Sequence, residues 1–200
     1  MKSPRIRHII WLLLLWLMPG SFVVMGQNVN GESAQEAENV QDAIRLLTEH
    51  PQAQIIAGGS DVLVQIREGK RAGVELVSIY GLDELRGVSL EEDETLRIGS
   101  LTSFSHITKN ELIQKYIPVL GEAVDMVGGP QIRNIGTIGG NTCNGVTSAD
   151  SASTLFALDA IIELTGPEGI RRLPIREFYI KAGKVDIRQG ELQTGILIPK

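Results

Sequence analysis

Two glycine-rich segments, far apart in the chain, most constrain what this sequence can fold into. Of the 22 glycines, two are adjacent at Gly58-Gly59 and six more fall within residues 128–150. Each segment follows a stretch with the pattern of regular secondary structure, so each is expected to be an ordered connection. Glycine leaves the backbone amide groups open to a ligand, because no side chain covers them. Both segments therefore favour a site for an anionic group such as a phosphate.

The first glycine segment joins an apolar strand to a helix. We expect a strand at residues 54–57 and a helix from Val62 to Arg67, with Gly58-Gly59-Ser60-Asp61 between them. Unpaired amides at such a turn can hold a phosphate. An ordinary turn in which Ser60 or Asp61 caps the helix explains the same residues, so this segment alone does not decide between the two.

The second glycine segment, residues 128–150, is interpreted as a long ordered loop. It carries only two charged residues and keeps apolar side chains along its length, which argues against disorder. Thr137, Asn141 and Asn144 add neutral hydrogen-bonding groups. Asp150 is expected either to accept a hydrogen bond from a ribose hydroxyl or to cap the helix that follows.

Missing motifs exclude several classes of protein. There is no G-x-G-x-x-G after a strand and no G-x-x-x-x-G-K-[ST], so neither a Rossmann nor a P-loop phosphate site is expected. One cysteine, Cys143, and three scattered histidines predict no disulfide framework, no metal site and no catalytic residue, and Cys143 is expected to be a packed thiol. A net charge of −5 argues against nucleic-acid binding. Backbone donors without an acid–base pair are typical of a protein that holds an organic cofactor.

Composition divides the chain into three parts. Residues 1–26 combine basic residues with an apolar run, which fits a secretory signal, a membrane anchor or a misplaced gene start. Residues 27–38 are polar and acidic and are expected to be a linker. Residues 39–200 are expected to be the folded domain, with one lobe at about 39–79 and a second at about 80–200.

Hydrophobic periodicity and turn residues place the remaining elements. Helices are expected over residues 39–49, 62–67, 102–115, 118–127 and 150–158. Strands are expected over residues 54–57, 74–79, 87–90, 95–98, 160–165, 170–173 and 192–198.

Taken together, the two glycine segments resemble the flavin-binding loops in the FAD subunits of molybdenum hydroxylases. Ala57-Gly58-Gly59-Ser60-Asp61-Val62-Leu63 is similar to the first loop. The second loop is similar to Gly129-Pro130-Gln131-Ile132-Arg133-Asn134, Thr137-Ile138-Gly139-Gly140-Asn141 and Ser148-Ala149-Asp150. Within that family, the chain most resembles the FAD-binding subunits of bacterial xanthine dehydrogenases, over about residues 40–199.

The resemblance implies an α+β fold and a set of cofactor-binding residues. The fold would be a two-lobed FAD-binding domain of the PCMH or vanillyl-alcohol-oxidase type, with a small α/β lobe, a larger mixed-sheet lobe and no C-terminal family domain. In Gln193 the chain has a polar residue where the family usually has an aliphatic one, and Val127 falls where some relatives place a ring-shielding aromatic. The implied FAD-binding residues are Gln54, Ile55, Ile56, Ala57, Gly58, Gly59, Ser60, Asp61, Thr137, Ile138, Gly139, Gly140, Asn141, Asn144, Asp150 and, on a strand that touches the adenine, Leu192.

The resemblance also implies a function that needs partners. A molybdopterin-binding subunit would oxidise hypoxanthine or xanthine, a 2Fe-2S subunit would relay the electrons, and FAD held here would pass them to NAD. The family setting is cytoplasmic, and a membrane enters only if the leader is a true anchor. Two alternatives stay open: the FAD subunit of a related hydroxylase of carbon monoxide or an aromatic substrate, and a truncated scaffold that binds no flavin.

Overall fold

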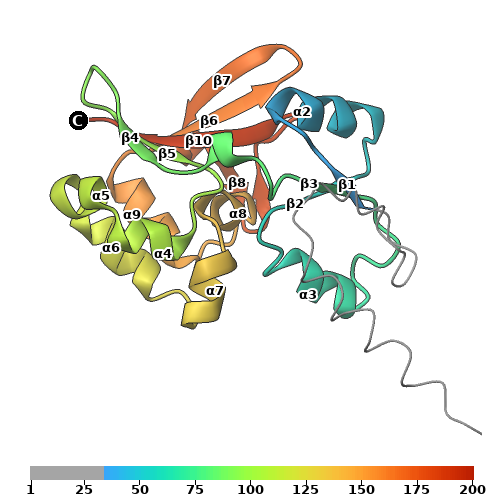
Figure 1. The fold of residues 1–200 in the computed structure, drawn as a ribbon, viewed down its shortest axis with the longest axis horizontal. Coiled ribbons are helices and arrows are strands. Elements are labelled where there is room, and N and C mark those ends of the chain that lie inside the picture. Colours follow the sequence, from blue (N-terminus) through green and yellow to red (C-terminus); the bar gives the residue numbers. More distant parts are fainter. Residues whose placement is uncertain (1–33) are drawn as a thin grey trace, which may run out of the picture.

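The computed structural model describes residues 34–200, which form two lobes side by side (Figure 1). The smaller lobe is built on a parallel sheet of order β1-β3-β2, from β1 (Ala34–Glu36), β3 (Leu76–Ser78) and β2 (Gln54–Ile56). Helices α2 (Val40–Glu49) and α3 (Val62–Arg67) belong to the same lobe. The predicted leader at 1–26 lies outside the described residues.

Helix α2 shows how the sequence builds the smaller lobe. Its N-cap is Asn39, whose side chain accepts a hydrogen bond from the Asp42 amide. Ala43, Leu46 and Leu47 recur at helical spacing, and all three are buried in the core of this lobe. The predicted helix at 39–49 is therefore confirmed, with its apolar face toward the sheet.

The larger lobe is built on a sheet of order β4-β5-β10-β6-β7. Its strands are β4 (Val88–Leu90), β5 (Leu96–Gly99), β10 (Leu192–Ile198), β6 (Ile161–Gly166) and β7 (Gly169–Pro174). All of its strand pairs are antiparallel, including the hairpin of β4 and β5. The prediction of a mixed sheet in this lobe is thus corrected: the parallel pairs are confined to the smaller lobe's sheet.

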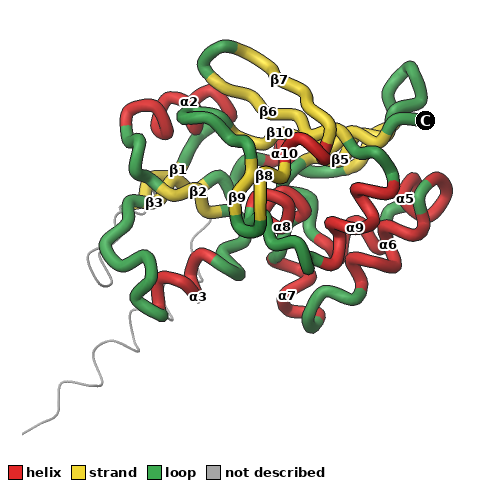
Figure 2. Tube along the Cα trace, turned by 180° about the vertical axis from the view of Figure 1, so that it is seen from behind, coloured by secondary structure: helices red, strands yellow, loops and turns green. Residues whose placement is uncertain are grey.

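Helices cover one face of the larger sheet (Figures 1 and 2). Ile98, Ile162 and Ile196 of the sheet are fully buried against them. A short 3-10 helix η2 (Asp83–Leu85) connects the lobes, and a small hairpin of β8 (Tyr179–Lys181) and β9 (Lys184–Val185) lies behind. The covering helices are α4 (Phe104–Lys109), α5 (Glu111–Tyr116), α6 (Pro118–Asp125), α9 (Asp150–Ala157) and α10 (Ile175–Phe178).

Two predicted boundaries are wrong for local reasons. The expected helix at 102–115 is broken at Asn110, whose side chain accepts hydrogen bonds from Leu112 and Ile113 amides and so starts α5. The expected linker at 27–38 contains β1, in which Ala34 pairs with Leu76. This polar stretch forms a strand because its backbone pairs with the edge of the sheet. It has no hydrophobic periodicity from which a strand could be predicted.

Strand β10 belongs to both lobes. Leu192 at its start is 2% exposed and packs in the core of the smaller lobe, together with Leu85 and Leu101. Ile196 and Ile198 at its other end pack in the core of the larger lobe. The predicted division near residue 79 is therefore not a strict boundary between the lobes. Residues that follow it in the sequence, such as Leu85, Leu101 and Leu192, complete the core of the smaller lobe.

A buried ion triad lies on the sheet face opposite the helices. The Glu163 side chain is 5% exposed and accepts from Arg97 at 3.0 Å and from Arg172 at 2.7 Å. Its Oε1 atom also accepts from the Thr194 hydroxyl. Burial favours the neutral acid, but the hydrogen bonds from Arg172 and Arg97 outweigh it and hold the pKa of Glu163 below its ordinary value.

A second carboxylate, Glu191, makes the stability of the fold sensitive to acid. Burial opposes its charge, yet hydrogen bonds from Arg171 and the Arg188 amide lower its pKa. The pKa values of both Glu163 and Glu191 are lower in the folded protein than in the unfolded chain. Their contribution to the free energy of unfolding is therefore fully present above the ordinary pKa value of 4.5. We expect the free energy of unfolding to fall as the pH drops below that value. Urea unfolding followed by circular dichroism between pH 7 and pH 3 measures this loss, and a constant midpoint across that range would contradict it.

The described residues contain no helix that is both long and apolar enough to cross a membrane.

Candidate functional site

The two glycine segments, distant in sequence, meet in the fold. At Gly58 an added Cβ atom would lie only 1.9 Å from the backbone oxygen of Ile135 and 2.7 Å from its carbonyl carbon. No side chain fits between two backbones at that distance, so glycine is required there. The turn after β2 therefore packs directly on the segment that precedes residues 137–141, as the prediction of a shared site requires.

A side-chain hydrogen bond makes a second link between the segments. Asn144 donates from Nδ2 to Oδ2 of Asp61 at 2.9 Å. Asp61 occupies the N-cap position of α3 but makes no capping bond with its side chain. The structure thus does not support the interpretation of Ser60 or Asp61 as an ordinary helix cap, because the Asp61 carboxylate faces the other segment.

The first glycine segment offers unpaired backbone donors. Within the described part of the chain, the amides of Gly58, Gly59 and Ser60 have no hydrogen-bond acceptor. Gly59 has φ of +76°, a left-handed conformation that an L side chain rarely adopts. Consecutive free amides around such a turn suit the oxygens of a phosphate or diphosphate.

The second glycine segment is more helical than predicted. Residues 128–150 contain α7 (Pro130–Ile135) and α8 (Ile138–Cys143) before α9 begins, where we expected a long loop. Pro130 suits the first turn of α7, and Thr137 caps α8 by accepting from the Gly140 amide at 3.1 Å. Glycine disfavours helix in isolation, but packing of α8 against the larger lobe decides the outcome.

Helix α8 uses most of its own amides inside the protein. The Ile138 amide donates to Thr102 and the Gly139 amide to Ser100, at 3.1 and 2.8 Å. The expectation that this segment supplies free main-chain donors is therefore corrected at these positions. Instead, α8 presents an exposed backbone at Gly140, which has no side chain to cover it. A Cβ atom added at Gly140 would contact only the Thr137 hydroxyl oxygen.

Two further predicted polar residues lie near the start of α9. Asp150 is exposed and is the first helical residue, while Ala149 is the N-cap, so the alternative of Asp150 as a cap is wrong. Asn141 accepts from the Ser151 hydroxyl at 2.5 Å, which ties α8 to α9. The Asp150 carboxylate therefore stays open to a ligand, whereas the Asn141 oxygen is already used.

The apolar residues predicted to bind a cofactor serve mainly as supports. Leu192 is 2% exposed inside the smaller core, and Ile55 and Ala57 pack against the same core. Gln54 and Ile56 are half-buried on β2, immediately before the turn.

Buried polar atoms around α8 are a feature that the sequence did not indicate. In the described residues, the side-chain atoms that are buried without a partner are Ser100 Oγ, Tyr179 OH and Gln193 Nε2. Ser100 lies against Gly139, whose added Cβ would be 2.7 Å from the Ser100 Cβ, and Gln193 contacts Thr142 and Cys143. An unsatisfied buried group costs about 1–3 kcal/mol, so each of these atoms calls for a partner such as an ordered water or a ligand.

Cys143 behaves as a packed thiol. Burial raises its pKa to about 12, so the sulfur stays protonated and is a poor nucleophile at neutral pH. Burial likewise raises the pKa of the neighbouring Tyr179 phenol to about 12, with a smaller contribution from Cys143. Among the described residues, no three His, Cys, Asp or Glu side chains converge as metal ligands.

Two hollows of the surface lie away from the glycine segments. One of about 350 Å³ is lined by residues 106 and 109–112, at the junction of α4 and α5. Another of about 350 Å³ opens beside the ion triad, next to the start of α2. The candidate site is therefore defined by the contact of the two segments rather than by a large cavity.

The arrangement fits a dinucleotide cofactor better than a side-chain active site. Free amides at Gly58, Gly59 and Ser60 suit a diphosphate, and the open backbone at Gly140 admits a close approach. The unpartnered atoms of Ser100 and Gln193 lie against α8. These features suit a large ligand that has an anionic diphosphate and otherwise neutral polar groups. They do not include a side chain placed as a general acid or base.

Comparison with known proteins agrees with this interpretation. A family model described as the FAD binding domain in molybdopterin dehydrogenase matches residues 29–200. The chain is 42% identical over 167 residues to the xanthine dehydrogenase FAD-binding subunit of Escherichia coli O157:H7, covering 84% of this chain and 57% of that protein. It is 32% identical over 184 residues to the carbon monoxide dehydrogenase medium chain of Afipia carboxidovorans, covering 92% and 60%.

Solved structures give the same fold. Reconstituted CO dehydrogenase from Oligotropha carboxidovorans matches with a TM-score of 0.80 and 31% identity, over 92% of this chain and 60% of that one. Quinoline 2-oxidoreductase from Pseudomonas putida 86 matches with a TM-score of 0.81 at 23% identity, over 86% and 60%. The chain thus spans about three-fifths of the length of these relatives, and the predicted two-lobed fold is confirmed.

Proposed function

Because the chain belongs to the family of FAD-binding domains of molybdopterin dehydrogenases, we propose that it binds FAD in the electron-transfer subunit of a molybdenum-containing xanthine dehydrogenase. The observation that carries the proposal is the contact of Gly58 with the Ile135 backbone, which brings both glycine segments to one place. The members of the family that it matches are subunits of dehydrogenases.

The chain's own residues hold the cofactor rather than react with it. The amides of Gly58, Gly59 and Ser60 would bind the diphosphate, and the bare backbone at Gly140 would let it approach closely. Asp150 is exposed and suits a ribose hydroxyl. The hydrogen bond between Asp61 and Asn144 fixes the two segments relative to each other, so the cradle is preorganised.

Bound FAD would supply the redox chemistry, accepting electrons from an iron–sulfur centre and giving a hydride to NAD⁺. The protein supports that exchange with fixed backbone dipoles. Cys143 remains a protonated thiol and so does not compete as a nucleophile near the site.

The choice of xanthine dehydrogenase rests on sequence identity. Identity is 42% to the xanthine dehydrogenase subunit against 32% to the carbon monoxide dehydrogenase chain. The proposal accordingly includes a molybdopterin-binding subunit, a 2Fe-2S subunit, hypoxanthine or xanthine as substrate, and a cytoplasmic setting. Assembly with those two subunits and assay with xanthine and with carbon monoxide separates the two substrate classes, and oxidation of carbon monoxide alone would favour the related hydroxylase.

FAD uptake by the full chain is the direct test. We expect the purified protein, incubated with FAD and freed of excess by gel filtration, to keep a flavin absorption spectrum at up to one equivalent. Gly140→Leu should weaken FAD binding by at least about tenfold, a loss of about 1.4 kcal/mol, because the new side chain occupies the open backbone surface. Its added Cβ would lie 3.0 Å from the Thr137 hydroxyl oxygen, which caps α8, so the Thr137 side chain must shift slightly and a small loss of stability accompanies the substitution.

Two controls distinguish a loss of FAD binding from a loss of folded structure. Circular dichroism of Gly140→Leu should match that of the wild type, which shows that the lost binding is local. A wild-type protein that stays colourless with added FAD would overturn the proposal and favour a scaffold that binds no flavin.

A further inference from the structure

Helix α7 carries half of the junction between the two glycine segments, yet apolar packing does not hold it. None of its six residues is buried, and Ile132 and Ile135 are 43% and 44% exposed. Its last residue, Ile135, nevertheless supplies the backbone oxygen against which Gly58 packs. A helix without a buried face gains little from the hydrophobic effect, so other contacts must fix its position.

The Arg133 side chain fastens α7 to the end of α6. Its Nη1 atom donates to the carbonyl oxygens of Val127 and Gly128, at 3.2 and 2.9 Å. Its Nε atom lies 3.3 Å from Oδ1 of Asp125, the last residue of α6. The Arg133 side chain is only 18% exposed, so these charged contacts are partly shielded from water, which strengthens them. We call the three contacts the Arg133 bracket.

Helix α6 is a firm support for this bracket. Leu120 and Val124 of α6 are fully buried in the core of the larger lobe, so α6 cannot shift without disturbing that core. Beyond the other end of α7, the Phe104 amide donates to the Gly136 carbonyl at 3.2 Å. An atom added at Gly136 would lie 2.9 Å from the Phe104 ring, so the backbone is closely packed there. Helix α7 is thus tied to the larger lobe on both sides.

We propose that Arg133 is a positioning residue for the cofactor, because its bracket holds the Ile135 backbone where the turn at Gly58 can pack on it. This rests on the proposed function. Without the bracket, α7 would spend part of the time in positions where the two glycine segments do not meet. FAD would then bind only to the fraction of molecules with α7 in place, and its Kd would rise by the inverse of that fraction.

The test compares Arg133→Ala and Arg133→Lys in the full chain. We expect the Kd for FAD, measured by quenching of flavin fluorescence, to rise about tenfold in Arg133→Ala, as it would if α7 were in place in about one-tenth of the molecules. Lysine keeps the charge but lacks the planar fork, so Arg133→Lys should recover only part of the affinity. The melting temperature without FAD should fall by at most about 4 °C in either variant, because both cores stay intact.

Added guanidinium distinguishes positioning from general destabilisation. At about 20 mM, far below the molar concentrations that unfold proteins, the ion should occupy the vacated place beside the Val127 and Gly128 carbonyls. It should lower the Kd of Arg133→Ala toward the wild-type value and leave the Kd of the wild type unchanged. A raised Kd that guanidinium does not lower would show a merely structural role and overturn the inference.

Arg176→Ala is the matched control. Arg176 also donates to a backbone carbonyl, that of Phe156, and to a carboxylate, that of Asp159. Neither contact involves a glycine segment, so the Kd of this variant should equal that of the wild type. A Kd within about twofold of wild type in folded Arg133→Ala, well below the tenfold effect of losing the bracket, overturns the inference.

Hydrogen exchange of the ligand-free protein separates this inference from the proposed function. The amides of residues 131–136 should exchange at least about tenfold faster in Arg133→Ala than in the wild type, whereas those of α6 should keep their protection. Equal exchange of α7 in the two proteins would contradict the bracket even if FAD binds. Absence of FAD binding by the wild type would instead refute the proposed function.

Discussion

Gly58→Val should abolish FAD uptake and destabilise the protein. The first atom of the new side chain would lie 1.9 Å from the Ile135 oxygen, and a backbone atom cannot move aside as a flexible side chain can. The two glycine segments must separate, which moves the amides at Gly58, Gly59 and Ser60 away from the second segment. We expect a loss of about 3 kcal/mol in unfolding free energy, or about 6–12 °C in melting temperature, and at least about a hundredfold rise in the Kd for FAD.

A glycine in open space provides the control for this prediction. An atom added at Gly81 meets nothing within 4 Å, so Gly81→Val should leave both melting temperature and FAD binding close to wild type. Thermal unfolding and flavin titration of the two variants give the comparison. Wild-type FAD affinity in Gly58→Val would show that the contact of the segments does not shape the site.

Glu163→Ala should cause a large loss of stability without a direct effect on the cofactor site. The substitution removes a carboxylate that is 5% exposed and leaves Arg97 and Arg172 facing each other across the sheet. Removing one member of a buried ion pair costs about 3–5 kcal/mol when the remaining charge stays buried. Arg97 and Arg172 reach water in part, with side chains 27% and 52% exposed, so we expect about 3 kcal/mol.

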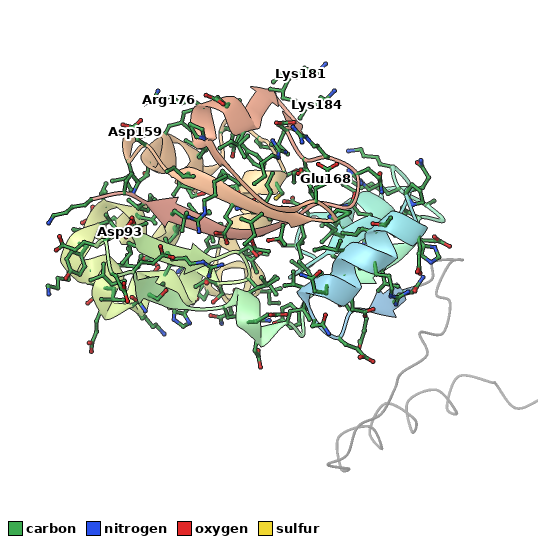
Figure 3. All side chains as sticks on the ribbon, turned by 90° about the horizontal axis from the view of Figure 1, so that it is seen from above. Asp93, Asp159, Glu168, Arg176, Lys181 and Lys184 are labelled. Carbon is green, nitrogen blue, oxygen red and sulfur yellow. The ribbon has the colours of Figure 1, made fainter. Side chains whose placement is uncertain are left out.

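The control for the ion triad is a pair on the surface. Asp159 bonds to Arg176 at 2.9 Å with 72% and 62% of the side chains exposed, at the edge of the larger lobe (Figure 3). Asp159→Asn should therefore cost less than about 1 kcal/mol, and asparagine, like aspartate, tolerates the left-handed φ of +48° at this position. Urea unfolding of both variants measures the difference in the free energy of unfolding. An equal decrease in the two variants would contradict the argument that the burial of Glu163 makes its removal more destabilising.

The parts of the fold that depend on local pattern could be predicted from the sequence. The apolar spacing of Val40, Ala43 and Leu47 gave α2, and the strands expected at residues 87–90 and 95–98 correspond to β4 and β5. The two glycine segments also stood out in the sequence, and the contact of Gly58 with the Ile135 backbone brings them together.

The errors arose where tertiary contacts outweigh local preference. Gly139 and Gly140 lie inside α8, although glycine disfavours helix, because Thr137 caps the helix and the larger lobe packs on it. Strand β1 has three polar or small residues and gains its order from pairing with β3. Asn110 divides the predicted helix because its side chain caps α5, a position that asparagine favours.

The polar pairs across strands could not be foreseen. Glu163 lies 66 residues from Arg97 along the chain, and Gln193 lies 51 residues from Thr142. Such partners follow from the register of β5, β6 and β10, which a single sequence does not fix.

Strand β10 acts as a mechanical tie between the lobes. Its first residue, Leu192, is anchored in one hydrophobic core and Ile196 and Ile198 are anchored in the other. A rigid-body swing of one lobe away from the other would have to bend this strand or extract Leu192 into water. Admission of a cofactor is therefore better served by small local displacements of the short helices α3 and α7 beside the glycine segments than by a hinge.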